Sequence, residues 1–211
     1  MSRPPTVRRA EERFRTDDHT PGAVTFHSFS YGRHYDADNI AFGPVMAINT
    51  EHLAPGAGYD EHHHSDVEIV TWVLEGTLEH RDSTGTHGLV RPGTLQRLSA
   101  GSGVSHTERN VSADEPLVFV QMMVRSDHDG APRYADADAP TIDVHAPATL
   151  RVLTAGTYAL PGPLLVHVTR GTLTTAAHRL APGDEIRSDA PLDLELEHGA
   201  EALAWLLDPP R

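Results

Sequence analysis

The chain has 211 residues, a net charge of −13 and 38% hydrophobic residues, which suffices for one large all-β domain or two smaller ones. All 17 basic residues are arginine, and cysteine is absent. These absences exclude a Schiff-base or P-loop lysine, a cysteine nucleophile, a thiolate metal site and a disulfide, so any metal must have nitrogen and oxygen ligands. The acidic charge argues against direct nucleic-acid binding and against an anionic membrane surface as partner.

No apolar run approaches the length that spans a bilayer, so we expect a soluble, cytoplasmic protein without a membrane partner. A twin arginine begins the segment 8–13, but acidic residues follow it where a signal peptide would have an apolar stretch. We interpret the arginine-rich start of the chain as a flexible or surface-packed terminus.

Short β-rich runs separated by turn signals recur along the first part of the chain, and no strong amphipathic helix interrupts them. In chain order we predict strands over 45–49, 68–74, 76–80, 95–98 and 117–124, with turns at 82–85 and 91–93. This spacing is typical of an antiparallel sandwich or barrel.

The composition then shifts to Asp, Ala and Pro over 126–148, which predicts a linker. Beyond it, the order of strand, glycine turn, Pro-Gly turn and strand returns over 164–207 as a weak internal repeat. We therefore predict a first domain over 1–125 and a degenerate second domain over 149–211. The second domain has no His-x-His and no partner for His167, so we expect it to bind no metal.

Two histidine-rich segments carry the candidate chemistry, His62-His63-His64 and His106-Thr107-Glu108. Both lie in predicted strands, where alternate side chains share a face, so His62 pairs with His64 and His106 with Glu108. If the strands face each other, three imidazoles and one carboxylate surround one point and leave coordination positions free on a bound metal. His63 should point away, although a slip of one residue would reverse this.

The spacing around these histidines resembles the paired motifs of the cupin superfamily, in which Glu68 follows His-x-His and Pro92-Gly93 precedes the second histidine. More narrowly, the chain is similar to the pirin family over roughly residues 20–135. The segments that carry this similarity are 27–32, 35–43, 68–85 and 100–108. The resemblance implies two tandem cupin barrels of the double-stranded β-helix or jelly-roll type, which is a bicupin.

Carried over by position, the resemblance assigns His62, His64, His106 and Glu108 as metal ligands. Glu68 matches the glutamate of the first motif, as an alternative ligand or a group that orients a ligand histidine. Gln121 matches a glutamine that faces the cavity. The family usually has His-Pro-His, so His63 is a departure. Fe(II) is the expected metal, while Mn, Ni, Co, Cu and Zn remain open because this ligand set does not select among them.

The resemblance also implies a quercetin 2,3-dioxygenase type of enzyme, in which both atoms of O2 enter a flavonol-like substrate and carbon monoxide leaves. Glu108, or Glu68 if it is not a ligand, would accept the proton of the substrate hydroxyl. The alternative is a noncatalytic metal-binding regulator with a protein partner, since eukaryotic pirins resemble iron-dependent transcription cofactors.

Three further expectations concern the surroundings of the site. The substrate pocket should lie inside the first barrel and be lined mainly by apolar groups. His27 should make a structural hydrogen bond near the mouth of the barrel. His80, which precedes a predicted hairpin turn, should belong to the surface or the turn.

Overall fold

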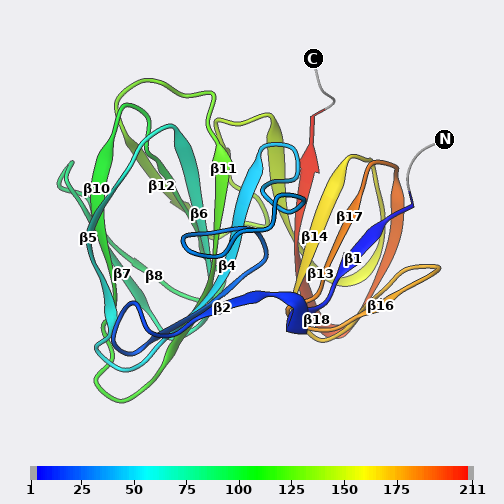
Figure 1. The fold of residues 1–211 in the computed structure, drawn as a ribbon, viewed down its shortest axis with the longest axis horizontal. Coiled ribbons are helices and arrows are strands. Elements are labelled where there is room, and N and C mark those ends of the chain that lie inside the picture. Colours follow the sequence, from blue (N-terminus) through cyan, green and yellow to red (C-terminus); the bar gives the residue numbers. More distant parts are fainter. Residues whose placement is uncertain (1–3, 209–211) are drawn as a thin grey trace. The chain divides into compact units, whose positions relative to one another are not determined.

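The computed structural model describes residues 4–208, and almost all of its regular structure is β-strand. The exception is one short 3-10 turn, η1 (Ala10–Glu12), so the predicted all-β class is confirmed. The chain divides into two compact units (Figure 1). Within the described residues, the N-terminal barrel comprises residues 14–146, and the C-terminal barrel comprises residues 147–208 together with 4–13. Within the described residues, no helix is both long and apolar enough to traverse a lipid bilayer.

The N-terminal barrel consists of two antiparallel sheets. The seven-stranded sheet has the order β12-β9-β6-β11-β4-β3-β2, and the four-stranded sheet has the order β5-β10-β7-β8. The strands of the larger sheet are β2 (Phe14–Thr16), β3 (Ala23–His27), β4 (Val45–Leu53), β6 (Val67–Glu75), β9 (Leu95–Ser99), β11 (Leu117–Arg125) and β12 (Arg133–Ala137). Those of the smaller sheet are β5 (Gly58–His64), β7 (Leu78–Asp82), β8 (His87–Val90) and β10 (Val104–Asn110).

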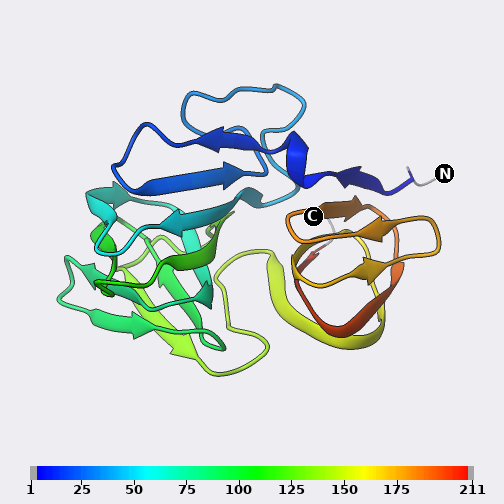
Figure 2. The same cartoon turned by 90° about the horizontal axis from the view of Figure 1, so that it is seen from below.

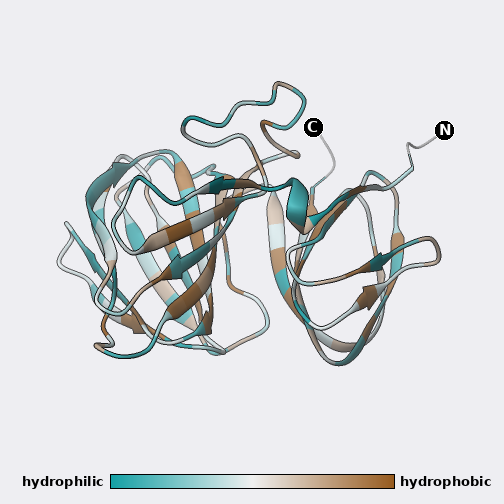
Figure 3. Ribbon diagram, turned by 60° about the horizontal axis from the view of Figure 1, so that its bottom comes forward, coloured by the Kyte–Doolittle hydropathy of each residue, from teal (hydrophilic) through white to brown (hydrophobic). Residues whose placement is uncertain are grey.

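Two apolar clusters form the core of this barrel, because alternate residues of its strands turn inward. One cluster of buried side chains includes Leu53, Leu78 and Phe119. The other includes Ile69 and Leu98. Hydrophobic stretches run along the strands, whereas η1 and several of the loops are hydrophilic (Figure 3). The apolar clusters thus fill part of the interior, and the polar residues described below occupy the remainder.

Most of the predicted linker over 126–148, namely residues 126–146, is a structural part of the N-terminal barrel. Strand β12 pairs with β9. The hydroxyl of Ser126 donates to Glu68 of β6 at 2.6 Å and to the carbonyl of His145 at 3.3 Å. The backbone nitrogen of Asp127 also donates to the carbonyl of His145. The composition of this stretch favours a loop, but its strand completes the edge of a sheet and its loops cover polar groups of that sheet.

The C-terminal barrel contains a sheet of order β1-β17-β14-β18-β15-β16, with β13 paired to β18. Its strands curve round an apolar core that includes Leu164, Val166 and Ala202 (Figure 2). The strands are β1 (Thr6–Arg8), β13 (Ala148–Leu160), β14 (Leu164–Arg170), β15 (Leu173–Thr174), β16 (Arg179–Leu180), β17 (Glu185–Ser188) and β18 (Leu192–Leu207).

Residues 4–13 belong to this barrel and not to the first domain, which the sequence analysis placed over 1–125. Strand β1 pairs antiparallel with β17, with Val7 opposite Ile186, and Val7 packs against the apolar core. Arg9 forms an ion pair with Asp184 at 2.7 Å, and Asp184 also accepts from the backbone nitrogen of Ala10. Of the two alternatives given for this terminus, flexible or surface-packed, the pairing of residues 6–10 fits the surface-packed one.

Candidate metal centre

The candidate metal centre lies on the four-stranded sheet, where β10 runs between β5 and β7. In the strand register His106 faces His62 on one side and Asp82 on the other. Glu108 faces Tyr59 and His80, after an irregularity in the pairing with β5. Because alternate residues share a face, this register gathers several polar side chains on one side of the sheet.

Three histidines from β5 and β10 form one cluster. The ring centroids are 5.0 Å apart for His62 and His64, 4.4 Å for His62 and His106, and 5.1 Å for His64 and His106. One nitrogen from each ring lies within 4.8 Å of the others, close enough for all three to hold one ion. The structure therefore brings together the three histidines that the sequence nominates.

The hydrogen bonds of these rings leave nitrogens available for a metal. Nδ1 of His62 lies 2.8 Å from the carbonyl oxygen of Asp60; as the donor it leaves Nε2 with the lone pair. Nε2 of His64 and both nitrogens of His106 are buried without a hydrogen-bond partner. Buried polar atoms without a partner are costly, and metal coordination would satisfy them. The residues present thus fit a metal ion.

The electrostatics of the cluster keep the imidazoles of His64 and His106 neutral, which is the form that binds metal. Burial, with the neighbouring His106 and His62, lowers the pKa of His64 to about 4. Burial, with His62 and His80 beside it, lowers the pKa of His106 to about 3. At neutral pH both rings therefore offer lone pairs and need not release a proton first.

Glu108 is buried and held by Gln121. The side-chain nitrogen of Gln121 donates to both carboxylate oxygens, at 2.8 and 2.9 Å. Gln121 lines the adjoining cavity, which agrees with its predicted position. Glu108 forms a second possible ligand group with His106 and His80, so it approaches the cluster through His106.

Glu68 is not at this site, and its assignment as an alternative ligand was wrong. Its buried carboxylate accepts from Ser99 at 2.7 Å and from Ser126 at 2.6 Å, and it lies 3.8 Å from Nε of Arg97. Glu68 belongs to β6 of the other sheet, and a turn with Asp66 at positive φ separates β6 from the histidine strand. Its partners identify it as part of a polar network under the segment 126–146.

His63 points away from the cluster, as strand alternation predicts. Its side chain is exposed, whereas His62 and His64 are half-buried. The ring of His63 lies against Gly103, where an added Cβ would meet it at 2.8 Å. Gly103 has φ +133, so this position favours glycine both for conformation and for space.

His80 was wrongly interpreted as a surface residue. Its side chain is fully buried on β7, and its ring centroid lies 5.4 Å from that of His106. The alternation Leu78, His80, Asp82 on one face, with Arg81 exposed on the other, was the available signal. The charged residues between them obscured it.

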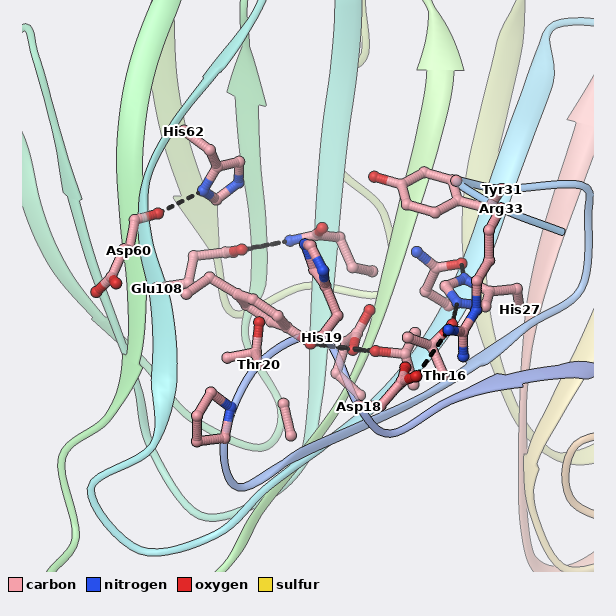
Figure 4. A pocket seen from close by; sticks show the side chains of 18 of the residues that line it. Thr16, Asp18, His19, Thr20, His27, Tyr31, Arg33, Asp60, His62 and Glu108 are labelled. Atoms are coloured by element: carbon pink, nitrogen blue, oxygen red, sulfur yellow. Dashed lines mark hydrogen bonds and ion pairs between the residues drawn. The ribbon is translucent and has the colours of Figure 1, made fainter.

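A cavity of about 760 Å³ adjoins the cluster, with His62 and Glu108 in its lining. Figure 4 shows these two residues on one wall and His27, Tyr31 and Arg33 on the other. Polar residues are more numerous in this lining than predicted, although apolar atoms still contribute most of its surface. The lining residues are Thr16, Asp18, His19, Thr20, Pro21, Ala23, Thr25, His27, Tyr31, Gly32, Arg33, Asn49, Glu51, Tyr59, Asp60, His62, Glu108, Gln121 and Met123.

The wall opposite the cluster contains an aromatic stack that hydrogen bonds hold in position. His27 lies 3.0 Å from Asn49 through Nδ1 and 3.0 Å from Thr16 through Nε2, so the predicted structural hydrogen bond is present. Its ring stacks on Tyr31, with centroids 5.1 Å apart and planes 15° from parallel. Burial, with the charge of Glu51, raises the pKa of Tyr31, so the phenol stays protonated and can donate.

A second buried carboxylate, Glu51, lines the same cavity. It accepts a hydrogen bond from the hydroxyl of Tyr59 at 2.6 Å and another from Thr25. Burial, together with Glu51, holds the pKa of Tyr59 well above its usual value. Tyr59 faces Glu108 across the strands, so it links Glu51 to the candidate metal centre.

Comparison with known proteins supplies the family. The family model described as Pirin matches residues 7–124. A relative from Mycobacterium tuberculosis is 48% identical over 124 residues, which are 59% of this chain and 50% of that protein. The quercetin 2,3-dioxygenase of Escherichia coli is 40% identical over 111 residues, which are 52% of this chain and 48% of that protein. The matched region thus spans about half the length of these curated relatives.

Solved structures agree over nearly the whole chain. The bacterial pirin YhhW from Escherichia coli, in complex with nickel(II), has a TM-score of 0.87 and 26% identity, covering 98% of this chain and 100% of that one. A quercetin 2,3-dioxygenase from Acinetobacter baumannii has a TM-score of 0.76 and 18% identity, covering 97% and 79%. The fold is therefore that of tandem cupin barrels, as predicted.

Proposed function

The chain belongs to the pirin family, and we propose that its N-terminal barrel is a metal-dependent dioxygenase that acts on flavonol-like substrates with O2. One observation carries the proposal: His64 and His106 have buried nitrogens without partners, and His62 of the same cluster lines a cavity large enough for a small aromatic molecule. The similarity to a quercetin 2,3-dioxygenase from Escherichia coli supports the reaction class.

In this proposal His62, His64, His106 and Glu108 hold one divalent ion. Three neutral imidazoles and a carboxylate suit Fe(II), our expectation, as well as Mn, Ni, Co, Cu or Zn. The nickel(II) complex of the similar bacterial pirin supports a divalent transition metal. When bound, the ion would supply a Lewis acid and a binding position for O2.

The side chains of the cavity have separate tasks in this reaction. Glu108 accepts the proton of the substrate hydroxyl, while Gln121 holds its carboxylate in place. The stacked rings of His27 and Tyr31 offer a flat wall to a planar aromatic substrate. The protonated phenol of Tyr31 can donate to a substrate oxygen, and the polar side chains of the lining suit a molecule with several hydroxyl groups.

The experiment is oxygen uptake with quercetin by protein loaded separately with Fe(II), Ni(II) or Mn(II), with carbon monoxide measured alongside. We expect uptake and carbon monoxide release in a fixed ratio. Glu108→Gln should lower kcat by about 10²- to 10⁴-fold per bound metal, with less change in KM, because it removes the proton acceptor. Loaded protein that consumes no oxygen with any flavonol or catechol would favour the noncatalytic regulator instead.

A further inference from the structure

His80 and Asp82 lie next to the metal cluster, although neither belongs to the group of three histidines. Both are on β7, which pairs with β10, and the register sets Asp82 opposite His106 and His80 opposite Glu108. Their side chains are 0% and 1% exposed. Buried ionisable groups need partners, so the hydrogen bonds of this pair identify its role.

The hydrogen bonds of Asp82 determine the protonation at one end of the pair. Oδ1 of Asp82 accepts from the backbone nitrogens of Thr84 and Thr86 and from the hydroxyl of Thr84, at 2.9, 3.2 and 2.6 Å. Oδ2 lies 3.1 Å from Nε2 of His80. Three donors on Oδ1 favour the ionised carboxylate, which can only accept. Nε2 of His80 therefore carries the proton, and Nδ1 carries the lone pair.

The other end of the pair is Nδ1 of His80, a hydrogen-bond acceptor for which no donor is present among the described residues. Nδ1 of His80 is buried and has no hydrogen-bond partner. Both nitrogens of His106 are also buried and have no partner. A metal can satisfy only one nitrogen of His106, and the second must then keep its hydrogen and find an acceptor.

The candidate acceptors beside His106 are Glu108, Asp82 and His80, and both oxygens of Asp82 already have partners. Glu108 already accepts from Gln121 with both oxygens and is itself a candidate ligand. His80 lies in the same 4.8 Å group as His106, and the two rings are 5.4 Å apart between centroids. One nitrogen of each ring therefore lies within 4.8 Å of a nitrogen of the other, and Nδ1 of His80 is an acceptor that has no partner.

We propose that Asp82 and His80 form a hydrogen-bonded relay that orients His106 for metal binding. Asp82 accepts from Nε2–H of His80, and Nδ1 of His80 accepts from the nitrogen of His106 that does not bind the metal. His80 is thus a positioning residue that acts through His106. The inference rests on the metal centre of the proposed function and is independent of oxygenation.

The test is the affinity for Ni(II), measured by titration calorimetry on the full chain. His80→Leu and Asp82→Asn should each weaken binding by about 10- to 100-fold, the usual loss when the partner of a ligand histidine is removed. His80→Asn should recover most of the affinity, because its amide oxygen stands near the position of Nδ1. The matched control is His87→Ala on the neighbouring strand, an exposed imidazole paired with Glu79 at 3.0 Å, which should leave the affinity unchanged.

A second measurement needs no variant and so remains decisive if His80→Leu does not fold. Imidazole ¹⁵N NMR of the Zn(II)-loaded protein should show His80 as the Nε2–H tautomer with Nδ1 unprotonated and not bound to zinc. An Nδ1–H tautomer, zinc bound to His80, or unchanged nickel affinity in His80→Leu would each overturn the relay. If the variants bind nickel more weakly but the metal-loaded wild type consumes no oxygen with quercetin, the relay is supported and the dioxygenase proposal is refuted. A wild type that binds neither metal would overturn both.

Discussion

The side-chain nitrogen of Gln121 bridges both oxygens of Glu108, at 2.8 and 2.9 Å, inside the N-terminal barrel. Gln121→Leu removes this donor and leaves a buried carboxylate without it. We expect the affinity for Ni(II) to fall roughly tenfold, because the partners of ligands contribute on that scale. Titration calorimetry measures the change, and a circular dichroism spectrum like that of the wild type verifies the fold. Unchanged affinity would mean that Glu108 does not bind the metal.

The histidine cluster predicts a contrast between neighbouring residues. His106→Ala should abolish metal binding, since His106 is common to both ligand groups of the described residues. His63→Ala should keep nearly full binding, since its side chain is exposed on the other face of β5. Metal analysis after dialysis gives the stoichiometry, which we expect to be one ion per chain for the wild type and for His63→Ala. Loss of the metal in His63→Ala alone would refute this register.

Glu68 should influence stability and not metal binding. Glu68→Gln removes a buried charge that accepts from Ser99 and Ser126 and lies beside Arg97. We expect the free energy of unfolding to fall by about 1–3 kcal/mol, the usual cost of leaving buried polar groups unsatisfied. Urea unfolding measures this, with nickel titration in parallel. A lost metal together with unchanged stability would restore Glu68 as a ligand.

The metal-free protein should lose stability as the pH falls below neutral. The folded barrel holds the pKa of His64 near 4 and that of His106 near 3, below the ordinary 6.5. Between these values the unfolded chain binds protons that the folded chain does not, so the free energy of unfolding falls as the pH drops from 6.5 towards 4. Above pH 6.5 these two groups add no pH dependence.

This pH effect can be assigned to one barrel by fluorescence. The C-terminal barrel contains Trp205 and the N-terminal barrel contains Trp72, so Trp205→Phe makes Trp72 the reporter. In that background, His106→Leu should give a shallower slope of unfolding free energy against pH. An equal slope in both proteins would show that His106 is protonated normally in the folded state.

The site was predictable where strand alternation was clear and was missed where burial on both faces hid it. His62 and His64 alternate with the exposed His63, so sequence alone assigned their shared face. Glu68 lies on β6, where residues 68–73 are all buried, so periodicity could not tell which face it occupied. Glu68 was assigned from the motif resemblance, whereas the segment predicted as a linker supplies Ser126, which donates to its carboxylate.

The internal repeat predicted the second barrel but not its first strand. Turn signals and glycines mark the strands of each barrel locally, whereas the pairing of Val7 with Ile186 joins residues far apart in sequence. Neither composition nor spacing encodes such a contact. It follows from the unpaired edge that β17 would otherwise present.

Because β1 pairs with β17, the two barrels can complete their folding at different stages of synthesis. Every strand of the N-terminal barrel has been made once β12 is complete, so this barrel can fold while the ribosome is still adding the rest of the chain. Strand β1 is made before all of them, yet its partner β17 is among the last strands to emerge. A nascent chain therefore carries an unpaired β1 through most of its translation. The C-terminal barrel is completed late, because the pairing of β1 with β17 joins segments that are far apart in the sequence.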